Sequence, residues 1–411
     1  MNLELTQIAD ISNETLQITG SKSEANRLLI LQALYSKISI KNLSNSDDSQ
    51  VMQEAIVSSE ELVDIHHAGT AMRFLTSYFA TREGRKTVLT GSERMQQRPI
   101  KILVDALRDL GADITYQNEE GYPPIVLNGK KLTKNKVSLK ANVSSQYISS
   151  LMLIAPSLEN GLEIALEGKV TSVPYIKMTL SLLKEIGAEG SFEHNVIKIA
   201  PLAVCNTDTI VVESDWSSAS YFYSLVALSK NAKVTLGSYK KSSYQGDAAL
   251  AEIYKNLGVQ TSYNNNTITL EKVSDVTKGT DAFNGALDLA NSPDIAQTIA
   301  VTCFGLGVSC HLTGLHTLKI KETDRLEALK AEIEKLGGIV EITEDALKLR
   351  AESTIKAGVA IATYQDHRMA MAFAPLALRT QLLINEAEVV SKSYPDFWSD
   401  MQKLGFQINE V

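Results

Sequence analysis

Six apolar segments of the chain share one opening, in which small, polar or acidic residues precede a run of apolar positions. A helix has this pattern when polar groups cap its first turn and its body is buried. The pattern therefore predicts six buried helices, which open at Ser21, Gly69, Ser144, Ser217, Pro293 and Asp366.

A second pattern lies between these openings, where a short phrase ending in Leu-Gly or Ile-Gly recurs. Each phrase reads as a helix end followed by a strand, because glycine adopts the left-handed backbone of a helix end without a steric penalty. The glycines concerned are Gly111, Gly187, Gly258, Gly337 and Gly405.

The helix openings lie roughly 70 to 80 residues apart except for the first pair. Leu-Gly phrases alone recur by chance in α/β proteins, but two interleaved series favour a true repeat. We predict an α/β protein of six βαβαββ-like units, of which the first is shortened because it lacks a Leu-Gly phrase. Three openings fall in each half, so we expect two globular domains of three repeats each. The expected domains are residues 1–19 with 215–411, and residues 20–214.

Composition supports a chain that folds throughout, since 44% of its 411 residues are hydrophobic and 21% are charged. The first twenty residues resemble neither a secretory signal nor a transit peptide, and no apolar run is long enough to span a bilayer. The cysteines are Cys205, Cys303 and Cys310, and none forms a CxxC pair. We expect a reduced, cytoplasmic protein with no metal, no cofactor and no membrane partner.

The net charge of -8 argues against a nucleic-acid partner, so an anionic substrate has to meet locally clustered Lys and Arg. Helix starts suit this purpose because their free N–H groups attract carboxylate and phosphate. The string GSKSEANR places Lys22, Ser23 and Arg27 at the first opening. A bare helix cap with a solvated Lys22 explains this string equally well.

Four further strings add candidate groups before residue 215. In HAGTAMRFL, Gly69 lets an anion approach the backbone. In LTGSERMQQRPIKILVDAL, Arg98 precedes Pro99, so Arg98 points from a loop ahead of the next helix. Ser144, Ser145 and Gln146 open one helix, and Ser172 and Tyr175 flank the proline of another. Hydroxyl and amide groups of this kind suit a phosphate or a polyol, although ordinary capping is an equal alternative.

The second half contributes both carboxylates and cations. Asp294 falls in the first turn of an apolar helix, where it either caps the helix or acts as a base. KIKETDRLEAL is expected to place Lys321 and Arg325 on one helix face beside Glu322, and a solvated salt-bridged helix is the alternative. Arg368 opens the last of the six helices and Lys392 precedes a turn. His367 is expected to be structural.

Read in order, these strings resemble the enolpyruvyl transferase family, and in particular its branch that uses 3-phosphoshikimate. The resemblance runs nearly the whole chain, from GSKSxxNR through AGTAMR, RMxxRPI, VSSQ, SxPYI, SSASYF, QGD, PDxA, KETDRL and DHRMAM to KSYPDF. It implies a two-domain fold of the inside-out α/β barrel type. It also implies transfer of the enolpyruvyl group of phosphoenolpyruvate to the 5-hydroxyl of 3-phosphoshikimate with release of phosphate, a step of the shikimate pathway towards aromatic amino acids.

The resemblance further assigns residues to each substrate. The residues implied for 3-phosphoshikimate are Lys22, Ser23, Arg27, Ser144, Ser145, Ser172, Asp294 and Lys321. Those implied for phosphoenolpyruvate are Lys22, Gly69, Arg98, Gln146, Arg325, Arg368 and Lys392. The implied catalytic residues are Lys22, with Asp294 as the base for the 5-hydroxyl and Glu322 as the acid for the methylene carbon. Glu322 needs a raised pKa to act as an acid, which burial favours and the adjacent Lys321 opposes.

Three departures from the family pattern are His67 and Thr317 where relatives have Asn, and Phe74 where many relatives have Pro. The resemblance also implies a monomer and competition by the inhibitor glyphosate, which Phe74 is expected to weaken. The branch that uses UDP-N-acetylglucosamine carries a reactive cysteine in the loop that corresponds to residues 89–99, and this loop has none. A catalytically inactive anion-binding protein is the alternative of a different class.

Overall fold

The computed structural model of the chain describes all residues except 141–143, 169, 171–172 and 352–353. It divides the chain into two compact units. Unit 1 comprises Met1–Thr19 and Glu213–Val411, and unit 2 comprises Gly20–Val212. Each unit has its own hydrophobic core.

Three four-stranded sheets make up the described β-structure of unit 1. Their strand orders are β20-β21-β1-β22, β14-β15-β13-β2 and β16-β17-β19-β18. The strands are β1 (Leu3–Leu5), β2 (Thr15–Leu16), β13 (Lys233–Gly237), β14 (Val259–Asn264), β15 (Thr267–Lys272), β16 (Asp281–Asp288), β17 (Ser309–Thr313), β18 (Ile339–Ile342), β19 (Leu347–Arg350), β20 (Val359–Ile361), β21 (Leu382–Ile384) and β22 (Ile408–Glu410).

Unit 2 contains two four-stranded sheets and one two-stranded sheet among its described residues, with orders β4-β5-β7-β6, β10-β11-β9-β8 and β12-β3. The small sheet belongs to the repeat that lacks a Leu-Gly phrase. The strands are β3 (Ser39–Lys41), β4 (Leu62–Asp64), β5 (Lys86–Thr90), β6 (Asp113–Tyr116), β7 (Ile125–Asn128), β8 (Lys136–Lys140), β9 (Leu162–Glu167), β10 (Gly190–Glu193), β11 (Val196–Ile199) and β12 (Thr209–Val211).

The repeat is visible in the strand pairing. In each four-stranded sheet one parallel pair is extended by two antiparallel pairings, as in β4-β5-β7-β6 and β16-β17-β19-β18. A buried helix connects the parallel strands, because a parallel pair requires a crossover. For example, α3 (Gly69–Ala80) connects β4 to β5, and α10 (Ala296–Leu306) connects β16 to β17.

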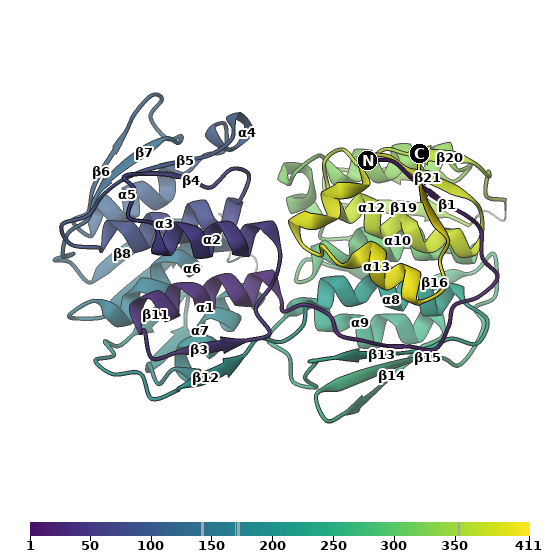
Figure 1. Cartoon of the computed structure of the whole chain (residues 1–411), viewed down its shortest axis with the longest axis horizontal. Helices are drawn as coiled ribbons and strands as arrows, with labels where there is room; N and C mark the ends of the chain where they lie inside the picture. The colour runs from purple at the N-terminus through teal and green to yellow at the C-terminus, as the bar shows by residue number, and fades with distance from the viewer. Residues whose placement is uncertain (141–143, 169, 171–172, 352–353) are drawn as a thin grey trace. The chain divides into compact units, whose positions relative to one another are not determined.

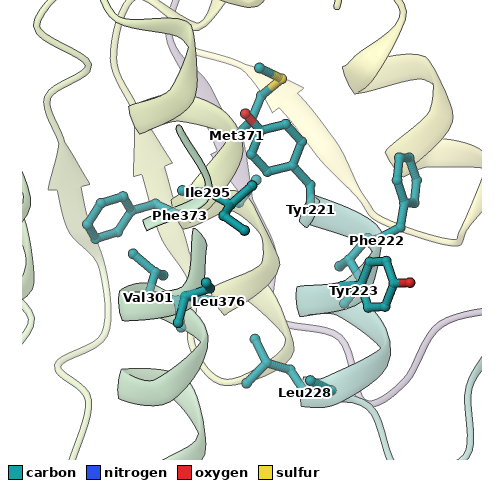
Figure 2. Close-up of a cluster of buried hydrophobic side chains, with 14 of the residues drawn as sticks. Tyr221, Phe222, Tyr223, Leu228, Ile295, Val301, Met371, Phe373 and Leu376 are labelled. Atoms are coloured by element: carbon teal, nitrogen blue, oxygen red, sulfur yellow. The ribbon is translucent and has the colours of Figure 1, made fainter. Parts of the chain in front are cut away.

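The predicted buried helices form the centre of each unit. In unit 1, α8 (Trp216–Leu228), α10 and α12 (His367–Phe373) pack on one another, with the sheets around them (Figure 1). In unit 2 the same position is taken by α1 (Lys22–Leu34), α3 and α6 (Ser145–Ile154). Every residue of α8 and α10 is buried, which explains why these segments are apolar all round. Figure 2 shows the part of the unit 1 core where Tyr221, Ile295 and Met371 meet.

Outer helices complete the repeats. They are α2 (Asp47–Val57), α4 (Glu93–Gln96), α5 (Lys101–Asp109) and α7 (Val173–Glu185) in unit 2, and α9 (Leu250–Ile253), α11 (Arg325–Lys335) and α13 (Phe397–Lys403) in unit 1. The five glycines of the recurring phrase have φ between 80° and 105°, so the predicted left-handed helix ends are confirmed. No helix in the described part of the chain is both long and apolar enough to cross a membrane.

Candidate active site

Arg325 of unit 1 is the centre of a cluster of three carboxylates. It is the first residue of α11 and is 2% exposed. Its Nη1 donates to Asp294 at 2.8 Å, and its Nη2 donates to Glu322 at 2.7 Å. Its Nε donates to Asp366 at 2.6 Å. Burial lowers the pKa of Arg325, but the three carboxylates outweigh burial and raise it above its ordinary value. One guanidinium therefore holds the carboxylates assigned above as base and acid.

Asp294 is surrounded by further positive charge. It lies in the short 3-10 helix Pro293–Ile295 that leads into α10. Lys321 Nζ and Arg368 Nη2 each lie 3.4 Å from its carboxylate oxygens. Burial raises the pKa of Asp294, but Arg368, Lys321 and Arg325 together hold it well below the ordinary value of 3.8. The Asp294 carboxylate is therefore ionised and able to accept a proton.

The expected helix face shared by Lys321 and Arg325 is wrong. Asp324 caps α11, accepting hydrogen bonds from the backbone N–H of Leu326 and Glu327, so the helix begins at Arg325. Lys321 follows the 3-10 helix His316–Ile320, and its Nζ reaches Asp294 from there. Capping by the short Asp324 side chain fixes the start of α11 at Arg325, so Lys321 lies outside the helix.

Arg368 connects this cluster to two residues that motif reading did not assign. Its Nη1 donates to the backbone carbonyl of Asp294 at 3.2 Å, and its Nη2 donates to Ser217 Oγ at 3.4 Å. Ser217 in turn donates to Asp247. Burial and the nearby Asp294 raise the pKa of Asp247 to about 7, against the opposing charge of Arg368. The strings QGD and SSASYF contain Asp247 and Ser217, but sequence spacing does not show that they meet Arg368.

The remaining unit 1 candidates lie in short helical segments. Lys392 Nζ donates to the backbone carbonyl of Gln365 at 2.7 Å. Thr317 Oγ1 is buried and has no hydrogen-bond partner among the described residues. His367 is 2% exposed, which agrees with the structural role expected for it.

In unit 2 the first helix start presents a cation. Lys22 is the first residue of α1, and its Nζ lies 3.7 Å from Asp48. Arg27 is buried deeper, 2% exposed, and its Nε and Nη2 donate to Thr179 at 2.7 Å and Ser149 at 2.9 Å. Burial lowers the pKa of Arg27 to about 10. Its Nη1 donates to the backbone carbonyl of Ser23 at 2.6 Å, so Arg27 fixes the turn that carries Lys22 and Ser23.

Phe74 packs behind this helix start, where it is 1% exposed. The guanidinium carbon of Arg27 lies 5.3 Å from the centre of the Phe74 ring and 5.7 Å from that of Tyr175. Phe74 is the sixth residue of α3 and therefore lies beyond its first turn. A substitution at Phe74 thus acts on Arg27 as well as on the backbone of α3.

The second helix start, at Gly69, is in contact with Arg98. A Cβ placed on Gly69 would lie 2.7 Å from Arg98 Nη1, so the guanidinium packs directly on the glycine backbone. The buried Arg73 donates to the carbonyls of Gly69 at 3.0 Å and of Pro99 at 3.3 Å. Burial, and then the charge of Arg98, lowers the pKa of Arg73 to about 10. Neither arginine forms an ion pair within the described residues, so this helix start has surplus positive charge.

The third helix start lies next to the second. Ser144 caps α6 by accepting a hydrogen bond from the backbone N–H of Gln146 at 3.3 Å. The side chain of Gln146 donates to Thr70 at 3.2 Å, which links α6 to α3. Ser145 is buried, and Ser172 lies outside the described residues. His67, the residue that replaces Asn, lies 3.6 Å from Asp47.

The geometry of each unit limits its chemistry. Unit 2 offers two adjacent helix starts with Arg98 and neutral donors, which suits an anion that carries carboxylate or phosphate. Unit 1 offers three carboxylates on one guanidinium, together with the cations Lys321, Arg368 and Lys392, which suits proton transfer on an anionic substrate. No group of His, Cys, Asp or Glu side chains in the described parts of the chain is arranged to hold a metal ion.

Comparison with known proteins agrees with this chemistry. A sequence profile of EPSP synthase (3-phosphoshikimate 1-carboxyvinyltransferase) matches residues 53–401. A 3-phosphoshikimate 1-carboxyvinyltransferase of Bacteroides fragilis is 47% identical over 398 residues, which cover 96% of each chain. One of Histophilus somni is 33% identical over 436 aligned positions and 98% of each chain.

Solved structures show the same fold. The EPSP synthase of Acinetobacter baumannii superimposes with a TM-score of 0.82 over the full length of both chains at 20% identity. The enolpyruvyl transferase NikO of Streptomyces tendae does so with a TM-score of 0.73 over 100% of this chain and 99% of its own, at 13% identity.

Proposed function

The chain belongs to the EPSP synthase family, and on that basis we propose which of its residues carry each step of the reaction. The enzyme transfers the enolpyruvyl group of phosphoenolpyruvate to the 5-hydroxyl of 3-phosphoshikimate and releases phosphate, in the biosynthesis of aromatic amino acids. The observation that carries the assignment is the Arg325 guanidinium, which holds Asp294 and Glu322 at 2.8 and 2.7 Å. These two carboxylates perform the two proton transfers of the addition step.

Asp294 is the proposed base. It takes the proton of the 5-hydroxyl while that oxygen bonds to the central carbon of phosphoenolpyruvate, and Glu322 protonates the methylene carbon. The tetrahedral adduct then expels phosphate as its methyl group returns a proton to Glu322. The low pKa of Asp294 means that its carboxylate is ionised at the start, and anionic substrates that pair with the surrounding cations raise this pKa towards the value that suits a base. Glu322 must begin protonated, which phosphoenolpyruvate favours by adding negative charge beside it.

We assign phosphoenolpyruvate to cations and to open backbone at a helix start. Arg98 on Gly69 carries this part of the proposal, because a charge-assisted hydrogen bond to a carboxylate or phosphate satisfies its free donors. The full set is Lys22, Gly69, Arg98, Gln146, Arg325, Arg368 and Lys392.

We assign 3-phosphoshikimate to Lys22, Ser23, Arg27, Ser144, Ser145, Ser172, Asp294 and Lys321. Within this set Arg27 acts mainly by fixing the turn at Ser23, since Thr179 and Ser149 occupy two of its nitrogen atoms. Lys22 and Lys321 are more exposed, and each lies beside a carboxylate.

A phosphate-release assay tests the function directly. Phosphate is expected only when phosphoenolpyruvate and 3-phosphoshikimate are both present, together with a product heavier than 3-phosphoshikimate by one enolpyruvyl group. Release from phosphoenolpyruvate alone, or none from the complete mixture, contradicts the proposal.

We further propose a cytoplasmic monomer that glyphosate inhibits in competition with phosphoenolpyruvate. The family relationship supports this, and the helix start at Gly69 with Arg98 offers an anion site of the required charge. Light scattering after size-exclusion chromatography measures the mass, for which 44.9 kDa is expected. Inhibition that is not competitive with phosphoenolpyruvate contradicts the shared site.

A further inference from the structure

Segment 362–366 of unit 1 contacts Lys392 and Arg368, two of the cations that we assign to phosphoenolpyruvate. It connects β20 to α12. The backbone carbonyl of Gln365 accepts a hydrogen bond from Lys392 Nζ at 2.7 Å. The carboxylate of Asp366 caps α12 by accepting from the backbone N–H of Arg368 at 2.8 Å. The position of this segment therefore determines where Lys392 and Arg368 lie.

The backbone of this segment has an unfavourable conformation. Tyr364 and Gln365 have φ values of 54° and 55°, so two consecutive residues with side chains adopt the left-handed region. Such residues persist only where surrounding contacts hold them. The free chain would not keep this path by local preference.

One face of α11 supplies the contacts. Glu332 is fully buried and accepts hydrogen bonds from the hydroxyl of Tyr364 at 2.6 Å and from the backbone N–H of Ala362 at 3.2 Å. Arg325 lies seven residues earlier, on the same face, and donates to Asp366 at 2.6 Å. Hydrogen bonds with α11 therefore hold segment 362–366 at both ends, at Ala362 and at Asp366.

The charges at this contact are balanced. Lys335 donates to both oxygens of Glu332 at 2.8 Å, so the buried carboxylate is paired. Burial and the bond to Glu332 raise the pKa of Tyr364 to about 12, which keeps the phenol protonated and donating at neutral pH.

We propose that Glu332 and Tyr364 are positioning residues for phosphoenolpyruvate, which hold segment 362–366 so that Lys392 and Arg368 are presented in their binding geometry. This inference rests on the proposed assignment of those two cations. It differs from a purely structural role because it predicts an effect on one substrate only. Small displacements of a charged group that contacts a substrate weaken binding strongly.

Tyr364→Phe tests the proposal, since it removes one hydroxyl and keeps the ring. We expect KM for phosphoenolpyruvate to rise about tenfold, which corresponds to about 1.4 kcal/mol. KM for 3-phosphoshikimate and kcat should stay within about twofold of wild type. Tyr35→Phe is the matched control, because the Tyr35 hydroxyl also donates a single hydrogen bond, to the carbonyl of Leu202 in unit 2. It should leave both KM values unchanged.

Two further variants separate the possible outcomes. Glu332→Gln combined with Tyr364→Phe should raise KM for phosphoenolpyruvate no more than the stronger single change, because both act on the same contact. Lys392→Ala reports on the proposed function alone. If Lys392→Ala raises this KM and Tyr364→Phe does not, the positioning role is wrong and the binding assignment stands. If neither raises it, both are wrong. Equal rises in both KM values for Tyr364→Phe, with a lower melting temperature, would assign Tyr364 a structural role only.

Discussion

Replacing Asp294 by asparagine removes one negative charge from the cluster of cations around it and preserves the size of the side chain. In the wild type, Asp294 accepts from Arg325 at 2.8 Å, and Lys321 and Arg368 each lie 3.4 Å away. If Asp294 is the base, kcat should fall about 100- to 10,000-fold, or about 2.7 to 5.5 kcal/mol of barrier. This is larger than the effect expected on substrate binding.

The effect on stability should be smaller. Removing one partner of a buried ion pair costs about 3 to 5 kcal/mol when the other charge is left alone. Arg325 keeps Asp366 and Glu322 in the variant, so we expect a loss of about 1 to 3 kcal/mol, the range of a charged hydrogen bond. A protein with about 5 to 15 kcal/mol of stability remains folded after this loss.

Steady-state kinetics and urea unfolding separate these effects. KM for phosphoenolpyruvate should stay the same or fall, because the variant has one more net positive charge near an anionic substrate. Asp288→Asn is the control, since Asp288 is exposed and accepts from the backbone N–H of Ala290. Retention of kcat within about threefold in a folded Asp294→Asn protein would refute the assignment, since a general base contributes at least about 100-fold.

The pH dependence gives a second check. Because the folded pKa of Asp294 lies well below 3.8, its ionised form stabilises the folded protein above the unfolded pKa of about 3.9. This contribution is lost as the pH falls through the folded pKa. The stability difference between wild type and Asp294→Asn should therefore shrink below about pH 4. A difference that grows as the pH falls below about 4 contradicts the low pKa.

Three other substitutions have expected outcomes. Lys392→Ala should raise KM for phosphoenolpyruvate at least about tenfold and that for 3-phosphoshikimate much less, and equal rises in steady-state assays contradict the partition. Gly69→Ala should raise KM for phosphoenolpyruvate, because the added methyl group would lie 2.7 Å from Arg98 Nη1 and displace it; an unchanged KM shows that Arg98 does not bind there. Phe74→Pro should tighten glyphosate inhibition at a cost of about 3 kcal/mol in stability, since proline removes a helical hydrogen bond, and an unchanged inhibition constant in the folded variant rejects the effect.

Local physical preferences made much of the fold readable from the chain. The helices α8 and α10 are completely buried and mostly apolar, so each appears in the sequence as a largely apolar run. A helix that ends in left-handed backbone favours glycine, which is why Gly111 and Gly337 mark helix ends within the repeats. Proline likewise indicated that the helix after Arg98 starts beyond Pro99, and α5 begins at Lys101.

The site was less readable where a local preference competed with the pattern. The spacing of Lys321 and Arg325 suggested one helix face, but Asp324 caps the start of α11, so Lys321 lies outside the helix. The ring of Phe74 packs against Arg27, a neighbour far along the chain, and the motif does not show this contact. Neither feature could be predicted from the spacing of nearby residues, because that spacing does not show caps or the contacts that a side chain makes across the core.

The sequence by itself determined the α/β repeat, the helix starts and the family, because each depends on residues that are close together in the chain. Only the tertiary structure decided which charges meet. Arg325 reaches Asp294 and Asp366 across 31 and 41 positions, and Tyr364 reaches Glu332 across 32. Such pairs form because the buried helices bring their ends together, and a buried guanidinium or carboxylate must then find partners within a few ångströms. A motif can therefore show which residues make up a site, but which charged side chains pair with one another follows from packing.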